Sequence, residues 1–204
     1  MHAVITGHIV DKSLRTPQEW VQALKSVLNG FGSEPLDWQL FRGDSFQLVI
    51  DEPQNALLTA LRIRAAFKVA MGQDLQLAIG IGTVDFRSEA VAESNGDAFQ
   101  RSEYLFDQIV KQRCLLALST PWPAFDELMD VCLALALVVV DDWSQASAEY
   151  LHARWDYPEA NQEGLSRILG IGQSSVSDRK RRSHVEELTL LDHFFRTKYE
   201  AYLA

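Results

Sequence analysis

The sequence predicts an α+β fold in which a sheet domain is followed by a helical domain. Two observations support this prediction: strand-like and helix-like segments alternate up to residue 120, and every periodic segment after Pro123 has helical spacing. The change falls at Pro121-Trp122-Pro123, where each proline pushes the residue before it out of helical geometry. We therefore expect one domain over residues 1–120 and a second over residues 121–204.

The first domain is expected to begin with a strand, a helix and a hairpin. Residues 3–10 are a β-branched run typical of a strand, and residues 17–28 carry apolar side chains at helical spacing behind Thr16, a good helix cap. Residues 38–41 and 46–50 lie on either side of a turn that contains glycine and aspartate, which predicts a β-hairpin.

The rest of the first domain alternates helix and strand. Apolar periodicity predicts a helix over 53–69, a strand over 75–81, a helix over 97–111 and an edge strand over 114–118. The order β-α-β-β-α-β, followed by one more helix and strand, is that of a ferredoxin-like fold.

The helical domain contains the most apolar stretch of the chain, residues 128–140. This run is too short to cross a bilayer, which requires about 20 apolar residues in a helix. Its apolar side chains cover more of the helix circumference than one partner surface needs, so the helix must be enclosed. Either the rest of the chain encloses it, or a homodimer does, with the helix expected over 185–203 packing across the same interface.

A helix-turn-helix is predicted at about residues 160–184, with the sequence EGLSRILGIGQSSVSDRKRR. Leu165, Ile168, Leu169 and Ile171 would supply the apolar face, Gly170 would end the first helix, and Val176 would pack the second helix onto the first. The residues expected to reach bases or phosphates are Gln173, Ser174, Ser175, Ser177, Arg179, Lys180, Arg181 and Arg182.

Arg179 departs from the usual pattern, because an apolar residue is common at that position of a second helix. Its aliphatic stem could cover apolar surface while the guanidinium reaches water or phosphate. The departure leaves open a different docking of the second helix.

The charge of the chain restricts how it could bind DNA. The formal net charge is −9, and residues 121–204 hold 8 Lys and Arg against 14 Asp and Glu. Generic coating of nucleic acid is therefore excluded, because non-specific affinity needs many phosphate contacts. DNA binding would rest on the local basic run at residues 179–182, doubled in a homodimer.

The cellular setting is predicted from the cysteines and the N-terminus. Cys114 and Cys132 lie inside apolar stretches, which favours reduced thiols over a disulfide. Residues 1–10 lack the basic segment and cleavage site of a signal peptide. We expect a cytoplasmic protein without a membrane partner.

Several motifs give the chain a resemblance to known families. The order of elements, the Gly-Asp hairpin and the strand end IGIG resemble the palm of class III nucleotidyl cyclases and diguanylate cyclases. Over the whole chain, the segments ITGHIVDKS, RGDSFQLVI, LAIGIGTV and GDAFQRSEYLFD, with the helix-turn-helix after them, resemble the SatD family of small bacterial proteins. This resemblance implies a DNA-binding transcriptional regulator with a cyclase-like palm, and we call residues 1–120 the palm.

The cyclase resemblance also implies a site in the palm. Cyclases hold two divalent metals between a carboxylate on the first strand and another in the hairpin. Asp44 keeps the hairpin position, but His8 stands at the first-strand position, and Mg²⁺ prefers oxygen ligands. Asp11 could face the site only if the strand has ended before it.

The helix that carries catalytic side chains in cyclases is also only partly matched in this sequence. Gln100 stands where cyclases carry an asparagine, and Tyr104 stands where they carry an arginine. We therefore expect a degenerate, non-catalytic palm that acts as a sensor or scaffold without a cofactor. A nucleotide or other small anion is a candidate ligand for the palm, with candidate contacts His8, Asp11, Asp44 and Gln100.

Two alternatives remain open at the level of the sequence. The chain could be a nucleotide-binding or weakly active nucleotidyl-transfer enzyme that uses Asp44 and Mg²⁺. It could also be an assembly protein that contacts no DNA. The sequence shows no zinc pattern, phosphate loop or nucleophile elbow that would point to another class of enzyme.

Overall fold

A five-stranded sheet forms the centre of the first part of the chain in the computed structural model, which describes residues 1–11, 16–41 and 43–203. Its strands are β1 (His2–Ile9), β2 (Trp38–Phe41), β3 (Ser45–Ile50), β4 (Leu75–Gly82) and β5 (Leu116–Ser119). The helices are α1 (Pro17–Leu28), α2 (Ala56–Met71), α3 (Asp97–Gln112), α4 (Pro123–Val140), α5 (Gln145–Asp156), α6 (Gln162–Leu169), α7 (Gln173–Ser183) and α8 (Val185–Leu203), with 3-10 turns η1 (Pro53–Asn55) and η2 (Val91–Glu93). The predicted α+β fold is confirmed.

The sheet has the strand order β2-β3-β1-β4-β5. β1 runs antiparallel to β3 and β4, β2 runs antiparallel to β3, and β5 is an edge strand parallel to β4. The first four strands thus have the ferredoxin-like arrangement, and α3 and β5 extend it. The expected edge strand was placed two residues too early, because Cys114 and Leu115 still belong to the turn after α3.

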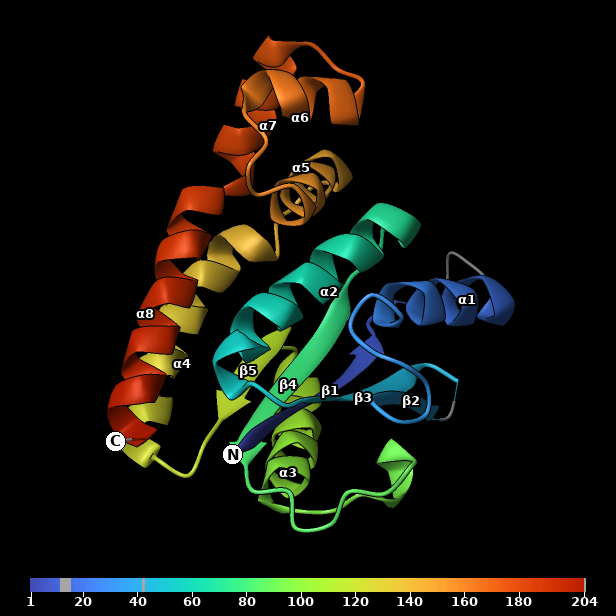
Figure 1. Cartoon of the computed structure of the whole chain (residues 1–204), viewed down its shortest axis with the longest axis vertical. Helices are drawn as coiled ribbons and strands as arrows, with labels where there is room; N and C mark the ends of the chain where they lie inside the picture. Colours follow the sequence, from blue (N-terminus) through green and yellow to red (C-terminus); the bar gives the residue numbers. More distant parts are fainter. Residues whose placement is uncertain (12–15, 42, 204) are drawn as a thin grey trace.

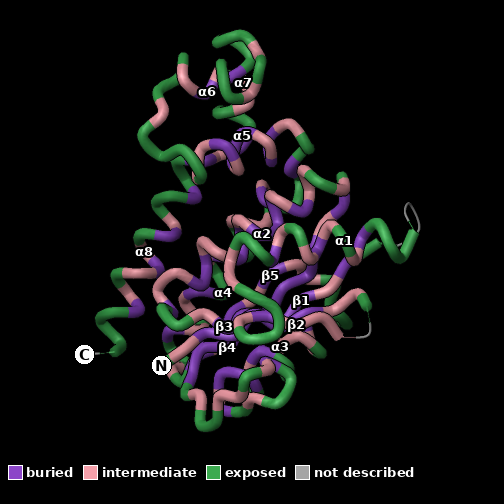
Figure 2. Tube along the Cα trace, turned by 45° about the vertical axis from the view of Figure 1, so that its right-hand side comes forward, coloured by how far each residue is buried: buried purple, intermediate pink, exposed green. Residues whose placement is uncertain are grey.

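The two faces of the sheet are covered by different helices (Figure 1). Ile5 and Ile9 of β1 belong to the main core, together with side chains of α1 and α2, whereas Val4 packs with Phe99 of α3 on the opposite face. Successive side chains of a strand point to opposite faces, so this division follows from the alternation of β1. Figure 2 shows the buried strands beneath these helices.

Gly80 allows α3 to lie directly on β4. A Cβ atom at this position would stand 2.3 Å from the carbonyl oxygen of Ala98 and 2.4 Å from the amide nitrogen of Ser102. Both atoms belong to the backbone of α3 and cannot move away alone. The glycines of the IGIG strand end therefore serve a close packing of helix and strand.

The helical part packs back onto the palm. α4 contacts β5, α5 contacts α2, and α8 runs beside α4 in the opposite direction (Figure 1). Buried residues of both parts, such as Ile79 and Phe125, belong to one hydrophobic cluster. The division into domains at residue 120 stays a prediction. Among the described residues, no helix is long and apolar enough to cross a membrane.

A buried arginine fixes the helical part against the palm. The guanidinium of Arg64 in α2 is fully buried and donates to Asp74, just before β4, at 2.8 Å and 2.9 Å. It also donates to Asp141, at the end of α4, at 2.8 Å. Burial alone would raise the pKa of Asp74, but the hydrogen bonds and charge of Arg64 outweigh burial and lower that pKa below its ordinary value.

Replacing Gly80→Ala is expected to lower the free energy of unfolding by about 1 to 3 kcal/mol, because the added methyl group overpacks the contact between α3 and β4. Urea-induced unfolding followed by circular dichroism measures this change. Gly164→Ala in α6 is the matched control, since its Cβ would come no closer than 3.4 Å to a neighbouring atom. An equal loss of stability in both variants would contradict the assignment.

Replacing Asp74→Asn is expected to lower the free energy of unfolding at pH 7 by about 3 kcal/mol, because the change leaves the charge of Arg64 only partly compensated. The contribution of Asp74 is present above the unfolded-state pKa, about 3.9. It is lost as the pH falls through the lowered folded-state pKa. The stability difference between the wild type and the variant should therefore begin to shrink as the pH falls below about 4 in urea titrations. A difference that stays constant from about pH 6 to about pH 2 would contradict this interpretation, and Asp142→Asn is the exposed control.

Candidate nucleic-acid interface

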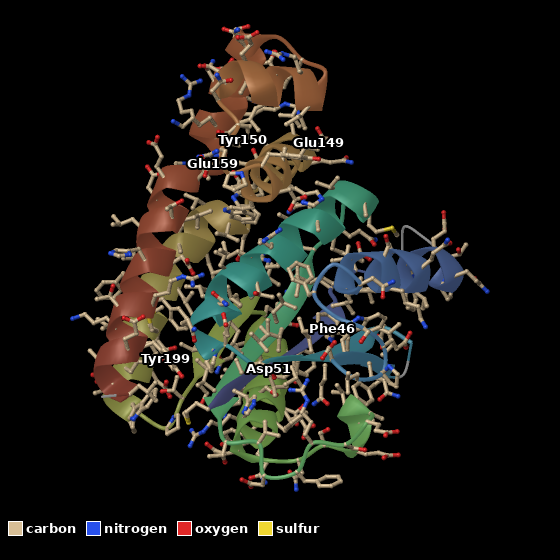
Figure 3. The ribbon with its side chains drawn as sticks, in the orientation of Figure 1. Phe46, Asp51, Glu149, Tyr150, Glu159 and Tyr199 are labelled. Carbon is tan, nitrogen blue, oxygen red and sulfur yellow. The ribbon has the colours of Figure 1, made fainter. Side chains whose placement is uncertain are left out.

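Three helices form a cluster at the end of the molecule farthest from the sheet (Figure 1). α5, α6 and α7 pack against one another, and we call this cluster the head, residues 145–183. Figure 3 shows Glu149 and Tyr150 on α5, the helix of the head that lies nearest the palm. The sequence predicted α6 and α7 but not the supporting role of α5.

The turn between α6 and α7 has the predicted geometry. Asn161 caps α6 by accepting a hydrogen bond from the amide of Gly164 at 2.9 Å. Gly170 ends the helix in the left-handed conformation with φ of 64°, and the amide of Ile171 closes the turn on the carbonyl of Ser166 at 3.1 Å. A glycine is favoured here because a side chain is strained at this φ.

The apolar contact between the two helices is narrower than predicted. Leu165 of α6 and Val176 of α7 are buried, as expected. Ile168 was expected on the same face but is 45% exposed. Leu165 is buried and Leu169 is half-buried, so the inward side of α6 runs through these two residues and Ile168 lies on the edge that faces solvent.

Gln162 connects the start of α6 to the start of α7. Its side-chain amide donates to the carbonyl of Gln173 at 2.9 Å and to the hydroxyl of Ser177 at 2.6 Å. These bonds fix the angle between the two helices in addition to the Leu165 and Val176 contact. Ser177 therefore has a partner within the head.

The beginning of α7 is open to solvent. The four polar residues predicted to contact bases are all exposed: Gln173, Ser174, Ser175 and Ser177. Gly172 precedes the helix and provides no side-chain cap, so backbone N–H groups of the first turn point outward without a side-chain acceptor. Such a helix start favours an anionic group.

The basic run lies at the end of α7, and three of its members are exposed: Lys180, Arg181 and Arg182. Lys180 pairs with Glu186 of α8 at 2.6 Å, and the hydrogen bond and charge of Glu186 raise its pKa. Arg181 pairs with Asp178 at 3.0 Å, with its side chain 77% exposed. Exposed pairs of this kind are weak and can exchange for a phosphate.

Arg179 has a different environment from its neighbours. Its guanidinium donates to the carboxylate of Glu149 on α5 at 2.6 Å and is largely covered. The residue that departs from the usual helix-turn-helix pattern therefore ties α7 to α5. It replaces the expected apolar contact by an ion pair.

The candidate residues of the palm lie around the end of β1. His8 faces α3, where its ring meets Phe106 edge to face at 5.1 Å between centroids. His8 is paired in register with Ser45 of β3, and the amide of Ile9 donates to the carbonyl of Asp44 at 3.3 Å. The structure thus brings the positions of His8 and Asp44 together.

The other two palm candidates are less closely connected with this point. β1 ends at Ile9, and Asp11 is exposed just beyond it. The strand therefore ends before Asp11, as a contribution of this residue to the palm site requires. Gln100 is exposed on α3, six residues before Phe106, or about 9 Å along the helix axis. Tyr104 is also exposed.

Metal binding by the palm stays untested. Within residues 1–11, 16–41 and 43–203, no three His, Cys, Asp or Glu side chains are grouped so that they could hold a metal ion. Asp44 accepts a hydrogen bond from the hydroxyl of Ser45 at 3.3 Å, as a turn aspartate often does.

A polar network between the sheet and α3 was missed by the sequence. Thr6 of β1 donates to Ser102 of α3 at 2.9 Å, and Gln47 of β3 donates to Glu103 at 2.7 Å. Thr6, Gln47 and Ser102 are buried. These residues lie among apolar neighbours on separate strands and a helix. No local sequence pattern therefore predicts that they contact one another.

Comparisons with known proteins give little support for an assignment. No family model matches the chain, and no curated protein matches it. Among solved structures, the chain is similar to a regulator of polyketide synthase expression from Bifidobacterium adolescentis, at 13% identity and a TM-score of 0.28, covering 98% of this chain and 83% of that chain. A TM-score this low supports neither a shared fold nor a shared function. The resemblance to the SatD family therefore stays a prediction.

A charge swap tests the structural role of Arg179. Arg179→Glu and Glu149→Arg alone should each lower the free energy of unfolding, and the double variant should recover about 0.5 to 1 kcal/mol of the summed loss. Thermal and urea unfolding give the three values. Arg181→Glu is the exposed control. If the loss of unfolding free energy in the double variant equals the sum of the two single losses, the Arg179–Glu149 ion pair contributes nothing to stability.

Proposed function

We propose that the chain is a DNA-binding transcriptional regulator, of the type that the SatD resemblance implies, and that α7 is its recognition helix. One observation supports this proposal most strongly: α7 is held against α5 and α6 by Leu165, Val176 and Gln162, while the opposite side of its first turns is exposed and polar. An α-helix fits the major groove of B-DNA, about 12 Å wide, when one side is free along its length.

The side chains of α7 divide into two groups in this proposal. Gln173, Ser174 and Ser175 lie on the open first turns, where short polar side chains can reach base edges. Lys180, Arg181 and Arg182 would contact phosphates and set the position of the helix on the duplex. Arg179 and Ser177 hold α7 in place through Glu149 and Gln162.

The charge distribution favours one orientation on DNA. With a net charge of −9, most of the surface is repelled by phosphates. The basic end of α7 lies on the head, away from the sheet (Figure 1). Binding would therefore depend on the local geometry of the head, and not on the overall charge.

The palm would serve as a non-catalytic sensor or scaffold. The imidazole of His8 contacts Phe106, and Tyr104 stands where cyclases carry a cation, so the groups that catalysis would require are replaced. A small anion or nucleotide near the end of β1 and the hairpin remains the proposed ligand. His8, Asp11 and Asp44 are its proposed contacts, with Gln100 farther along α3.

A salt titration of DNA binding tests the head. Fluorescence anisotropy with a labelled duplex pool, at 50 and 200 mM salt, should show an affinity that falls with salt. Because each phosphate contact contributes about 0.9 to the slope of log K against log salt, Arg181→Ala/Arg182→Ala should reduce that slope by about 1.8 for each bound chain. The affinity of this variant should fall roughly tenfold or more at the lower salt.

A matched control removes the same charge elsewhere. Lys25→Ala/Lys111→Ala deletes two cations from α1 and α3 and should leave the slope unchanged. If the wild type shows no salt dependence, or if both double variants lose the same affinity, α7 is not the contact surface. The assembly interpretation would then be favoured.

A further inference from the structure

The side of α4 and α8 that faces away from the palm is strongly apolar. Val131, Leu135 and Val138 of α4 are 62%, 70% and 73% exposed, and Leu190 of α8 is 68% exposed. Among the described residues, only Tyr104 of the other large apolar side chains exceeds 60% exposure. We call Val131, Leu135, Val138 and Leu190 the outer face. Contiguous exposed apolar groups of this kind are unusual on a monomer.

A groove lies between the two helices, and Leu135 and Leu190 of the outer face belong to its lining. It has a volume of about 550 Å³ and is lined by both helices. Cys132, Ala136 and Val139 of α4 form one wall, and Leu191 and Phe194 of α8 form the other. The same surface therefore presents an apolar groove and the exposed side chains of Val131 and Val138 outside it.

We propose that this surface binds a second copy of the chain, with the two-fold axis parallel to α4 and α8. A two-fold interface must be self-complementary, because the same patch occurs on both partners. The exposed Val131 and Val138 of one copy can cover the apolar groove of the other, because the same patch carries both features. The result is a four-helix bundle in which each α4 packs against the α8 of its partner.

The charges at the ends of the two helices favour this axis. Ring contacts of Trp122 and Phe125 with Tyr199 and Tyr202 place the start of α4 level with the end of α8. A parallel two-fold axis preserves these heights, so Glu127 of one copy would lie level with Lys198 of the partner. Lys198 already lies over the ring of Phe194 in the groove, at 5.6 Å. An axis perpendicular to the helices would instead bring the acidic start of α4 toward Asp141 and Asp142 at its end.

The same axis places both heads at one end of the dimer. α8 starts at Val185, directly after α7 ends at Ser183, so each head continues into the bundle without a linker. Two recognition helices on one side can contact two half-sites about one helical turn apart. This last step rests on the proposed function, whereas the interface itself does not.

The oligomeric state tests the interface without DNA. Sedimentation equilibrium of the wild type should give a mass of about 46 kDa, twice the 23.0 kDa of the chain. Leu135→Glu and Leu190→Glu should remain folded by circular dichroism, because both side chains are exposed in the single chain. Each should weaken dimerisation at least roughly 100-fold, since the dimer would bury unpaired carboxylates. Tyr104→Glu on α3 is the equally exposed control and should stay dimeric.

A charge swap tests the orientation of the axis. Glu127→Lys and Lys198→Glu should each weaken the dimer, and the double variant should recover most of the loss. A monomeric wild type at about 100 µM, or dimers that survive both glutamate variants, would overturn the proposal. If the dissociation constant of the dimer is the same in all of these charge variants, the parallel orientation of the axis is wrong. Because no DNA is present, these results are independent of the salt titration.

Discussion

The geometry of the second half depends on the buried guanidinium of Arg64. It lies in α2 and binds both Asp74, where β4 begins, and Asp141, where α4 ends. A buried charge is tolerated only with such partners, so the end of α4 must meet the palm at this point. The next helix, α5, then lies on α2 and carries α6 and α7 with it. One ion-pair network thereby sets the direction of α4, which bears the outer face, and the position of the head.

α5 connects the palm and the proposed recognition helix. It packs on α2, and its Glu149 pairs with Arg179 of α7. α2, α5 and α7 are thus in continuous contact. Coupling between a palm ligand and the head would require two states of this junction.

The sequence predicted the elements well where local patterns decide the structure. Apolar periodicity predicted α3 and α8 to within one or two residues, and Gly170 predicted the left-handed end of α6. It did not predict the ion pair of Arg179 with Glu149, because the partners lie 30 residues apart and neither has a distinctive pattern. The exposure of Ile168 was missed because Ile168 and Leu169 are both apolar, and the sequence does not show which of them packs against the core. The approach of His8 to Asp44 rested on family resemblance, since strand register cannot be read from spacing alone.

We propose that α7 recognises DNA as one of a pair of helices. Selection of bound duplexes from a random-sequence pool tests this proposal most directly. We expect two inverted half-sites centred about one helical turn, roughly 10 base pairs, apart. Ser174→Ala/Ser175→Ala should change the preferred bases within each half-site without changing their spacing. Absence of any enriched sequence, or a half-site unchanged in this variant, would contradict the account.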